Sequence, residues 1–254
     1  GWLARGSSTA SVVAADVPPA RPAPVAAPAP ESWQAELALY GWASGLTGTV
    51  QSFSRIPPAH VNVGFDQILK NLDGGIMIAG SATNGRFVVL GDIIYAKLSP
   101  KKDFALRGID GSVTVDVSNF IGLATGGYRV YADKNWNLDL LAGVRVFAVD
   151  NGVTLRLPRV AAEVASKNEA WVDGVVGLRA IYNINPNWVL TGIAFVGGIS
   201  SRYEWDLFAS IGYRFTETWG AFIGYRALGV DYRNNGFVYD VVQHGPLIGI
   251  SARF

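Results

Sequence analysis

Strict alternation of apolar and polar side chains is the feature that most constrains this chain of 254 residues. From Trp136 to Ala148 every even position is apolar, whereas the odd positions include asparagine, aspartate, glycine and arginine. The same pattern recurs over 172–182 and 205–215. A period of two over this length indicates β-strands with one apolar face, not helices. We therefore predict an all-β fold from residue 33 onwards.

Composition shows where that apolar face must lie. The chain is 50% hydrophobic and only 16% charged, whereas average proteins carry about 25% charged residues. Its mean hydropathy is +0.23, yet no apolar run approaches the roughly 18 residues of a transmembrane helix. Thirty glycines, with 8 Trp, 10 Tyr and 12 Phe, favour twisted strands and many turns. The sequence thus predicts strands whose apolar side meets lipid.

Several function classes are excluded by residue content. There is no cysteine and there are two histidines, which removes thiol chemistry and makes a histidine metal site improbable. The net charge is +1 without a basic cluster, so nucleic acid is not an expected partner. His60 and His244 adjoin no nucleophile motif of the G-x-S-x-G type. We predict no catalytic residue, no metal and no cofactor.

The connections between predicted strands are unequal at the two ends. Short turns are predicted at 83–86, 132–135, 183–187 and 216–218, and longer connections at 49–73, 99–113 and 151–168. Outer-membrane barrels show this asymmetry, with the short turns on the periplasmic side and girdles of aromatic residues at the membrane interfaces. The aromatic residues that flank the short turns or the chain end form a predicted belt: Trp33, Phe87, Tyr128, Trp136, Tyr182, Trp188, Tyr213, Trp219 and Phe254.

The pattern predicts a transmembrane, antiparallel, up-and-down β-barrel. About ten strands are expected, at 33–48, 74–83, 86–98, 115–131, 136–149, 169–183, 187–198, 203–215, 219–231 and 238–254. Eight strands are the alternative, because 74–83 and 187–198 alternate poorly. Both ends of the barrel segment then fall on the short-turn side.

The first 32 residues differ from the rest. The stretch 17–30 is almost entirely proline, alanine and valine, a composition that favours extended conformations and cannot build a core. Small residues around Ala14 are typical of a signal-peptidase site. We predict a signal-peptide remnant and a disordered Ala/Pro-rich periplasmic tail over 1–32, and a barrel over 33–254.

The last strand carries a resemblance to known proteins. Residues 247–254 alternate and end in Phe254, and they resemble the C-terminal strand that the barrel-assembly machinery of Gram-negative outer membranes recognises. With the Ala/Pro-rich lead, 33–254 is similar to small outer-membrane β-barrel proteins of alphaproteobacteria. The resemblance implies an outer-membrane location with periplasmic termini, contact with lipid and lipopolysaccharide, and the assembly machinery as a partner. In some relatives the mature N-terminus is joined to peptidoglycan, a pattern that Ala15-Asp16 matches loosely.

If the apolar face meets lipid, the other face lines the lumen. By parity the lumen receives Glu36, Asp92, Arg129, Asp139, Arg145, Asp173, Arg179, Asp206, Arg214, Arg226 and Arg253. These charges are expected to pair, because a narrow interior disfavours isolated ones. Distances along the strands from the short turns place Asp139 near Arg179 and Arg129, Arg145 near Asp173, and Glu36 near Arg253.

The function predicted first is a structural, envelope-integrity role, with paired charges filling the lumen. A small, weakly selective diffusion pore is the alternative, and a surface binding protein acting through 49–73 and 151–168 is a second one. The first long connection adds a short amphipathic helix, with Phe65, Ile68, Leu69 and Leu72 on one face. This helix is expected to cap the mouth, to enter the lumen, or to lie on the rim or the lipid surface.

Overall fold

The computed structural model describes residues 32–51, 58–99, 101–106, 109–157 and 160–254. The predictions made for residues 1–31, including the leader, the tail and Ala15-Asp16, lie outside these ranges. The described elements are β1 (Gln34–Trp42), β2 (Gly45–Gln51), β3 (Ala59–Val63), α1 (Phe65–Lys70), β4 (Leu72–Thr83), β5 (Phe87–Leu98), β6 (Lys101–Leu106), β7 (Ile109–Ala132), β8 (Trp136–Leu157), β9 (Val160–Asn183), β10 (Trp188–Gly197), β11 (Tyr203–Arg214), β12 (Trp219–Asn234) and β13 (Phe237–Arg253). Within the described residues, no helix is long and apolar enough to span a membrane.

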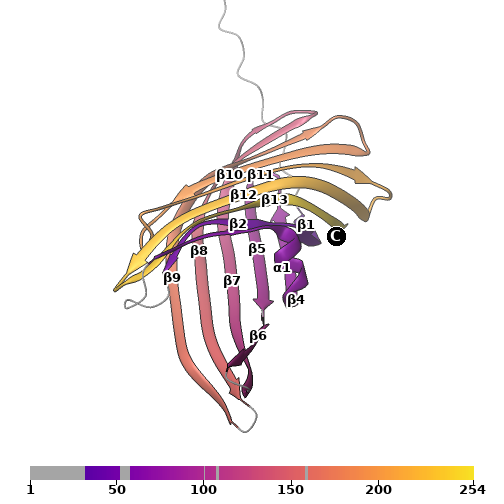
Figure 1. The fold of residues 1–254 in the computed structure, drawn as a ribbon. Helices are drawn as coiled ribbons and strands as arrows, with labels where there is room; N and C mark the ends of the chain where they lie inside the picture. The colour runs from indigo at the N-terminus through magenta and orange to yellow at the C-terminus, as the bar shows by residue number, and fades with distance from the viewer. Residues whose placement is uncertain (1–31, 52–57, 100, 107–108, 158–159) are drawn as a thin grey trace, which may run out of the picture.

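Ten antiparallel strands form a closed barrel (Figure 1). The wall runs in the order β1-β4-β5-β7-β8-β9-β10-β11-β12-β13, and pairing of β1 with β13 closes it. Two further strands, β2 and β3, extend the wall beside β13, and β6 pairs with the far end of β7. The predicted fold class and the strand number of ten are confirmed, and the eight-strand alternative is wrong.

The strand predicted over 33–48 is interrupted. The ladder between β1 and β13 ends at the pair Trp42–Leu247, and it resumes in β2 at the pair Gly45–His244. Pro246 lies at the break and has no N–H to donate, so the ladder cannot continue through it unchanged. Its carbonyl still accepts a hydrogen bond from the Ala43 N–H, at 2.8 Å. Proline therefore divides one predicted strand into two.

The three predicted long loops are wrong for most of their length. β2, β3 and α1 occupy much of 49–73, β6 and the start of β7 occupy 99–113, and the β8–β9 ladder continues to the pair Leu157–Val160. β7, β8 and β9 have 24, 22 and 24 residues, against about 9–11 needed to cross a membrane. They project beyond the rest of the wall in Figure 1. Continued pairing satisfies backbone polar groups that an irregular loop would leave to water.

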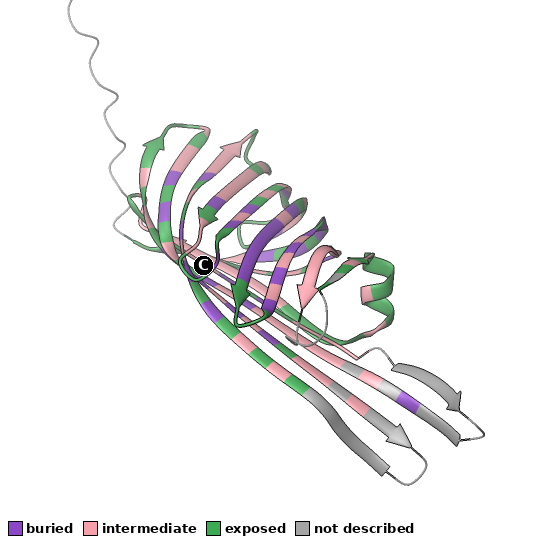
Figure 2. Cartoon of the chain, turned by 60° about the vertical axis from the view of Figure 1, so that its left-hand side comes forward, coloured by how far each residue is buried: buried purple, intermediate pink, exposed green. Residues whose placement is uncertain are grey.

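The two faces of the wall alternate as expected, and Figure 2 shows exposed and buried positions succeeding one another along the strands. On the outer face the belt residues are exposed, apart from half-buried Tyr182. They meet across neighbouring strands: Phe87 packs on Tyr128, Trp136 on Tyr182 and Trp188 on Tyr213. These pairs lie beside the short turns.

The predicted amphipathic helix is α1. It has six residues and buries none of them. Phe65 and Leu69 are exposed and Ile68 is half-buried, whereas Leu72, predicted on the same helix, is exposed at the start of β4. The helix stands outside the barrel, beside the wall (Figure 2), and does not enter the lumen.

Candidate functional site

The lumen is the candidate site, because the charged side chains of the strands point into it. Seven of the predicted lumen residues are almost inaccessible: Asp92, Asp139, Arg145, Asp173, Arg179, Asp206 and Arg226. The other four, Glu36, Arg129, Arg214 and Arg253, are half-buried. Glu204 is a buried acid that the sequence analysis missed, and it brings this set to six acids and six arginines.

Arg226 is the centre of an ion-pair layer across the middle of the lumen, made with Tyr40, Asp92, Asp206 and Arg145. Its guanidinium binds both carboxylate oxygens of Asp206, at 3.0 and 2.8 Å. A third nitrogen donates to Asp92 at 2.6 Å and to the Tyr40 hydroxyl at 3.1 Å, and that hydroxyl donates to Asp92 at 2.7 Å. One cation thus links strands from different sides of the barrel.

Arg145 joins this layer from β8. It lies opposite Asp173 in the β8–β9 ladder, as the sequence predicts. However, its ion-pair partners are on β11: Asp206 at 2.7 Å and Glu204 at 3.5 Å. Arg145 and Asp173 are therefore cross-strand neighbours, as predicted, but no ion pair joins them. A long arginine side chain reaches across the lumen, so its partner depends on barrel diameter as well as on strand register.

Asp173 binds the β10–β11 connection instead. One carboxylate oxygen accepts the N–H groups of Ile199, Ser200 and Ser201, each at 2.8 Å. The other accepts the Ser201 hydroxyl. Hydrogen bonds from several donors stabilise an ionised carboxylate without a cation. Asp173 thus fixes a turn at the end opposite the short turns.

A second group of charges lies nearer the short turns. Asp139 accepts hydrogen bonds from Arg129 at 2.8 Å and from Arg179 at 2.9 Å. Glu36 accepts one from Arg253 at 3.0 Å, across the strand pair that closes the barrel. These contacts join the residues that the predicted register brings together.

Arg214 differs from the other lumen arginines. Arg214 forms no ion pair among the described residues. Its guanidinium donates to neutral oxygens, the Asn183 side-chain carbonyl at 2.9 Å and the Pro186 carbonyl at 3.3 Å. Its Nε is buried and has no hydrogen-bond partner. The prediction that every lumen charge pairs with an opposite charge is therefore wrong at Arg214.

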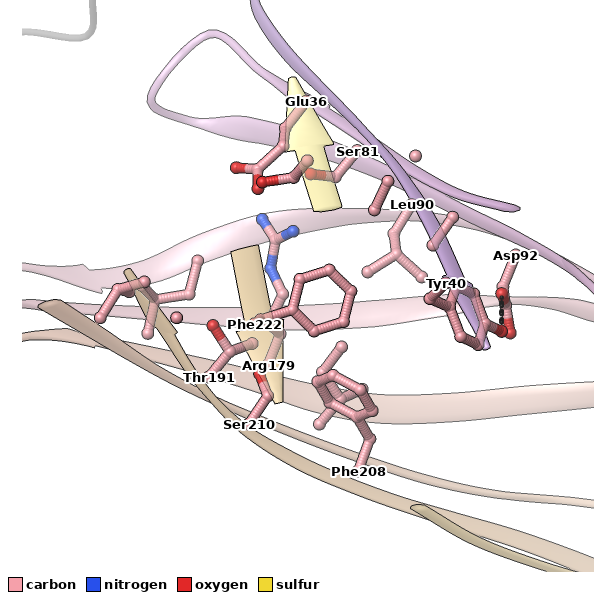
Figure 3. Close-up of a pocket in the computed structure, with 18 of the residues that line it drawn as sticks. Glu36, Tyr40, Ser81, Leu90, Asp92, Arg179, Thr191, Phe208, Ser210 and Phe222 are labelled. Carbon is pink, nitrogen blue, oxygen red and sulfur yellow. Dashed lines mark hydrogen bonds between the residues drawn. The ribbon is translucent and has the colours of Figure 1, made fainter. Parts of the chain in front are cut away.

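A cavity of about 200 Å³ occupies the short-turn half of the lumen. Glu36, Arg214 and Arg253 lie on its wall, and Asp92, Asp206 and Arg226 of the ion-pair layer also line it. Figure 3 shows the Arg179 side chain extending into it between Glu36 and Ser81 on one side and Thr191 and Ser210 on the other. Tyr40, Phe208 and Phe222 add aromatic surface. We call this cavity the inner vestibule.

The opposite half of the lumen is filled by hydrophobic side chains. The cluster comprises Trp42, Ile94, Ile121, Phe147, Val149, Trp171, Leu228, Val230, Tyr232, Phe237, Tyr239, Val241 and Leu247, all at most 6% exposed. Trp171 stacks on Tyr232 with ring centroids 4.0 Å apart, and on Phe147 at 5.0 Å. The Arg226 guanidinium lies over the Trp42 ring, which joins this aromatic core to the ion-pair layer.

The aromatic core was not predicted from the sequence, because the charged residues at inward-facing positions indicated a polar lumen. A signal was present in the unbroken apolar stretches 146–149 and 227–230, where both faces are apolar. A strand with two apolar faces is buried on both, here against lipid outside and the core inside.

The two histidines lie away from these charges. His244 is exposed on the outer face and shares a 2.7 Å hydrogen bond with the Tyr225 hydroxyl. His60 is exposed on β3, opposite Thr49. In the part of the chain that the structure describes, no three His, Asp or Glu side chains are grouped to hold a metal ion.

Comparison with known proteins shows which solved structures share this fold. No model of a known family matches the sequence, and no curated protein is significantly similar to it. Among solved structures, the outer membrane protease OmpT from Escherichia coli is similar over 89% of this chain and 97% of its own, with a TM-score of 0.50 and 9% identity. The fold is that of a bacterial outer-membrane β-barrel. The translocator domain of the autotransporter NalP from Neisseria meningitidis is also similar, over 88% of this chain and 89% of its own, with a TM-score of 0.45 and 11% identity.

Proposed function

We propose that this chain is an integral outer-membrane β-barrel with a structural, envelope-integrity role and a lumen that does not conduct. The closed wall, the apolar outer face and the aromatic belt support insertion in a bilayer, because only a closed barrel leaves no unpaired strand edge in lipid. The similarity to outer-membrane barrels is one of fold and supports the location, not the role.

The filled half of the lumen is the observation on which this role depends. An ion crossing the barrel would have to pass the ion-pair layer and then the aromatic core. Buried side chains are packed at nearly crystalline density, without water-filled paths. The pore alternative has the inner vestibule in its favour, but that cavity ends at Arg226 and Asp206.

Single-channel recording tests this directly. The purified, refolded protein is added to a planar bilayer, with a porin refolded in parallel as the positive control. We expect no steady conductance from the wild type. Steady channels whose ion selectivity changes in Arg214→Gln, but not in the exposed control Arg202→Gln, would show that ions traverse the lumen and would favour the pore.

We propose the orientation that the short turns indicate, with the short turns and both ends of the barrel-forming chain segment in the periplasm. The absence of native cysteine allows single cysteines to report it. Glu217→Cys lies in a short turn, and Arg202→Cys lies in the β10–β11 connection at the opposite end. A membrane-impermeant maleimide applied to intact cells should label only the second variant. Labelling of Glu217→Cys alone would reverse the orientation.

The proposed partners follow from the resemblance to alphaproteobacterial barrels. We propose recognition of the last strand through Phe254 by the assembly machinery, contact with lipid and lipopolysaccharide, and attachment of the tail to peptidoglycan. Digestion of purified sacculi with lysozyme should release muropeptides carrying a peptide that begins at Ala15. Recovery of Ala15 only with a free amine would argue against attachment.

We infer no catalytic role. OmpT is a protease by its name, but the similarity to it is one of fold. The two histidines of this chain have no carboxylate among their described hydrogen-bond partners, and general acid–base catalysis needs such groups placed within hydrogen-bond reach. The surface-binding alternative has one observation in its favour, the projection of β7, β8 and β9 beyond the wall (Figure 1).

A further inference from the structure

The inner vestibule has the dimensions of a small-molecule site. Its volume of about 200 Å³ would hold on the order of ten waters, at roughly 10–15 Å³ each by the same type of measure. Glu36 and Arg253 are about one-third exposed, so the cavity is in contact with solvent at the short-turn end. Its inner end is closed by the ion-pair layer. A cavity that is closed at one end can bind a small molecule but offers it no path through the barrel.

Positive charge is in excess around this cavity. Arg129 and Arg179 share one carboxylate, Asp139. Arg253 is paired with Glu36, and Arg214 forms no ion pair among the described residues, although the same Glu36 carboxylate attracts it at longer range. The charged residues that line the cavity carry a net excess of one positive charge: Arg179, Arg214, Arg226 and Arg253 against Glu36, Asp92 and Asp206. Asp92 and Asp206 lie at the inner end of the cavity, where Arg226 binds both.

Arg214 has unused hydrogen-bonding capacity at the vestibule wall. Its Nη groups donate to two neutral oxygens, and its Nε is buried without a partner. Arg214 is half-buried, and its guanidinium donates to neutral oxygens and to no carboxylate, so its charge is only partly compensated within the protein. A planar fork of N–H donors matches the geometry of a carboxylate or phosphate group. The residue is thus set up to bind an oxyanion.

We propose that the inner vestibule binds a small oxyanion, a carboxylate or a phosphate group, that enters from the short-turn side. Arg214 is its main ligand, with Arg179 and Arg253 supplying further positive potential. Hydroxyl groups of Ser81, Thr191 and Ser210 line the same space and offer additional donors. Phe208 and Phe222 beside them (Figure 3) favour an organic anion with an apolar part. Binding here requires no conduction and is independent of the proposed structural role.

Isothermal titration calorimetry of the full-length, refolded protein in detergent micelles tests the proposal. Inorganic phosphate and benzoate are titrated separately at low ionic strength, so the two arms distinguish a phosphate from an organic carboxylate. We expect saturable binding of at least one probe, weakened by added salt because the attraction is electrostatic. Saturation by neither probe would overturn the proposal.

Variants locate the site. Arg214→Gln should lower the affinity at least tenfold, and Arg214→Lys should lower it less because the charge remains. Arg202→Gln removes an exposed arginine at the other end of the barrel and should leave the affinity unchanged. Equal weakening by Arg202→Gln and Arg214→Gln would show non-specific attraction and would overturn the proposal.

A variant expected to raise the affinity makes the test independent of damage to folding, because a misfolded protein would bind less. Glu36→Gln removes a carboxylate at the mouth and frees Arg253, so it should raise the affinity several-fold. Unchanged or lower affinity in this variant, with folding verified by its heat-modifiable gel mobility, would contradict the assignment. Conductance need not be measured, so failure here leaves the proposed non-conducting role in place.

Discussion

The two halves of the lumen differ, although the same ten strands build both. On the short-turn side the interior is a hollow vestibule with arginines in excess, and on the other side it is an aromatic core. Arg226 lies at the boundary and touches both, through Asp206 and through the Trp42 ring. One barrel can therefore enclose a cavity in one half of its lumen and a packed hydrophobic core in the other. Strand number alone does not decide between pore and plug.

Removing the boundary cation should have the largest effect. Arg226→Gln leaves Asp92 and Asp206 buried without their shared partner, and breaking such a pair costs about 3–5 kcal/mol. The free energy of unfolding, measured by urea titration in detergent or lipid, should fall by that amount. Arg202→Gln, an exposed pair at 3.8 Å, should change it by less than about 1 kcal/mol. Equal small effects would mean that the layer does not stabilise the barrel.

Two leucine variants, one on each face of the wall, test whether the aromatic core excludes water. Leu228→Ala in the aromatic core should cost about 2–5 kcal/mol, because it leaves a cavity among packed side chains. Leu207→Ala on the neighbouring strand faces outward and should cost less than about 1 kcal/mol, since lipid fills the space. The same urea titrations measure both. If Leu228→Ala lowers the free energy of unfolding no more than Leu207→Ala does, the half of the lumen assigned to the aromatic core contains water.

The smallest effect is expected at a short turn. The pKa of Asp133 is lowered by hydrogen bonds from the Trp136 N–H, the Tyr131 hydroxyl and the Asn135 N–H. Its ionised form therefore adds stability above the unfolded pKa of about 3.9, and this contribution disappears as the pH falls through the lower folded pKa. Wild type should exceed Asp133→Asn in urea midpoint at neutral pH. A difference that persists unchanged at pH 2 would contradict this.

Much of the wall could be predicted from the sequence. Turn residues and a period of two fix which residues lie opposite each other, because a slip by one residue would reverse the faces. Asp139 and Arg179 therefore stand in the expected register. Glu204 lies in the predicted strand 203–215 and has the same parity as Asp206, but it precedes the alternating stretch that begins at Trp205 and was not predicted.

Contacts across the lumen could not be predicted in the same way. The partner of Arg145 lies on β11, three strands from its own β8. That distance depends on diameter, tilt and stagger, which no local pattern encodes. The aromatic core was hidden for a related reason: Phe147 and Trp171 come from adjacent strands, but Tyr232 and Phe237 reach them only once the barrel has curved round.

The Tyr40 hydroxyl has a consequence for how the barrel assembles. Tyr40 lies on β1, 186 residues from Arg226 and 52 from Asp92, and it joins both. While β1 is detached from β13 the sheet is open, and these charges lack one of their hydrogen-bond partners. Closing so long a loop costs entropy, but it also completes the layer. The last strand pairing and the burial of charge therefore reinforce each other, which favours all-or-none closure over a population of half-open sheets.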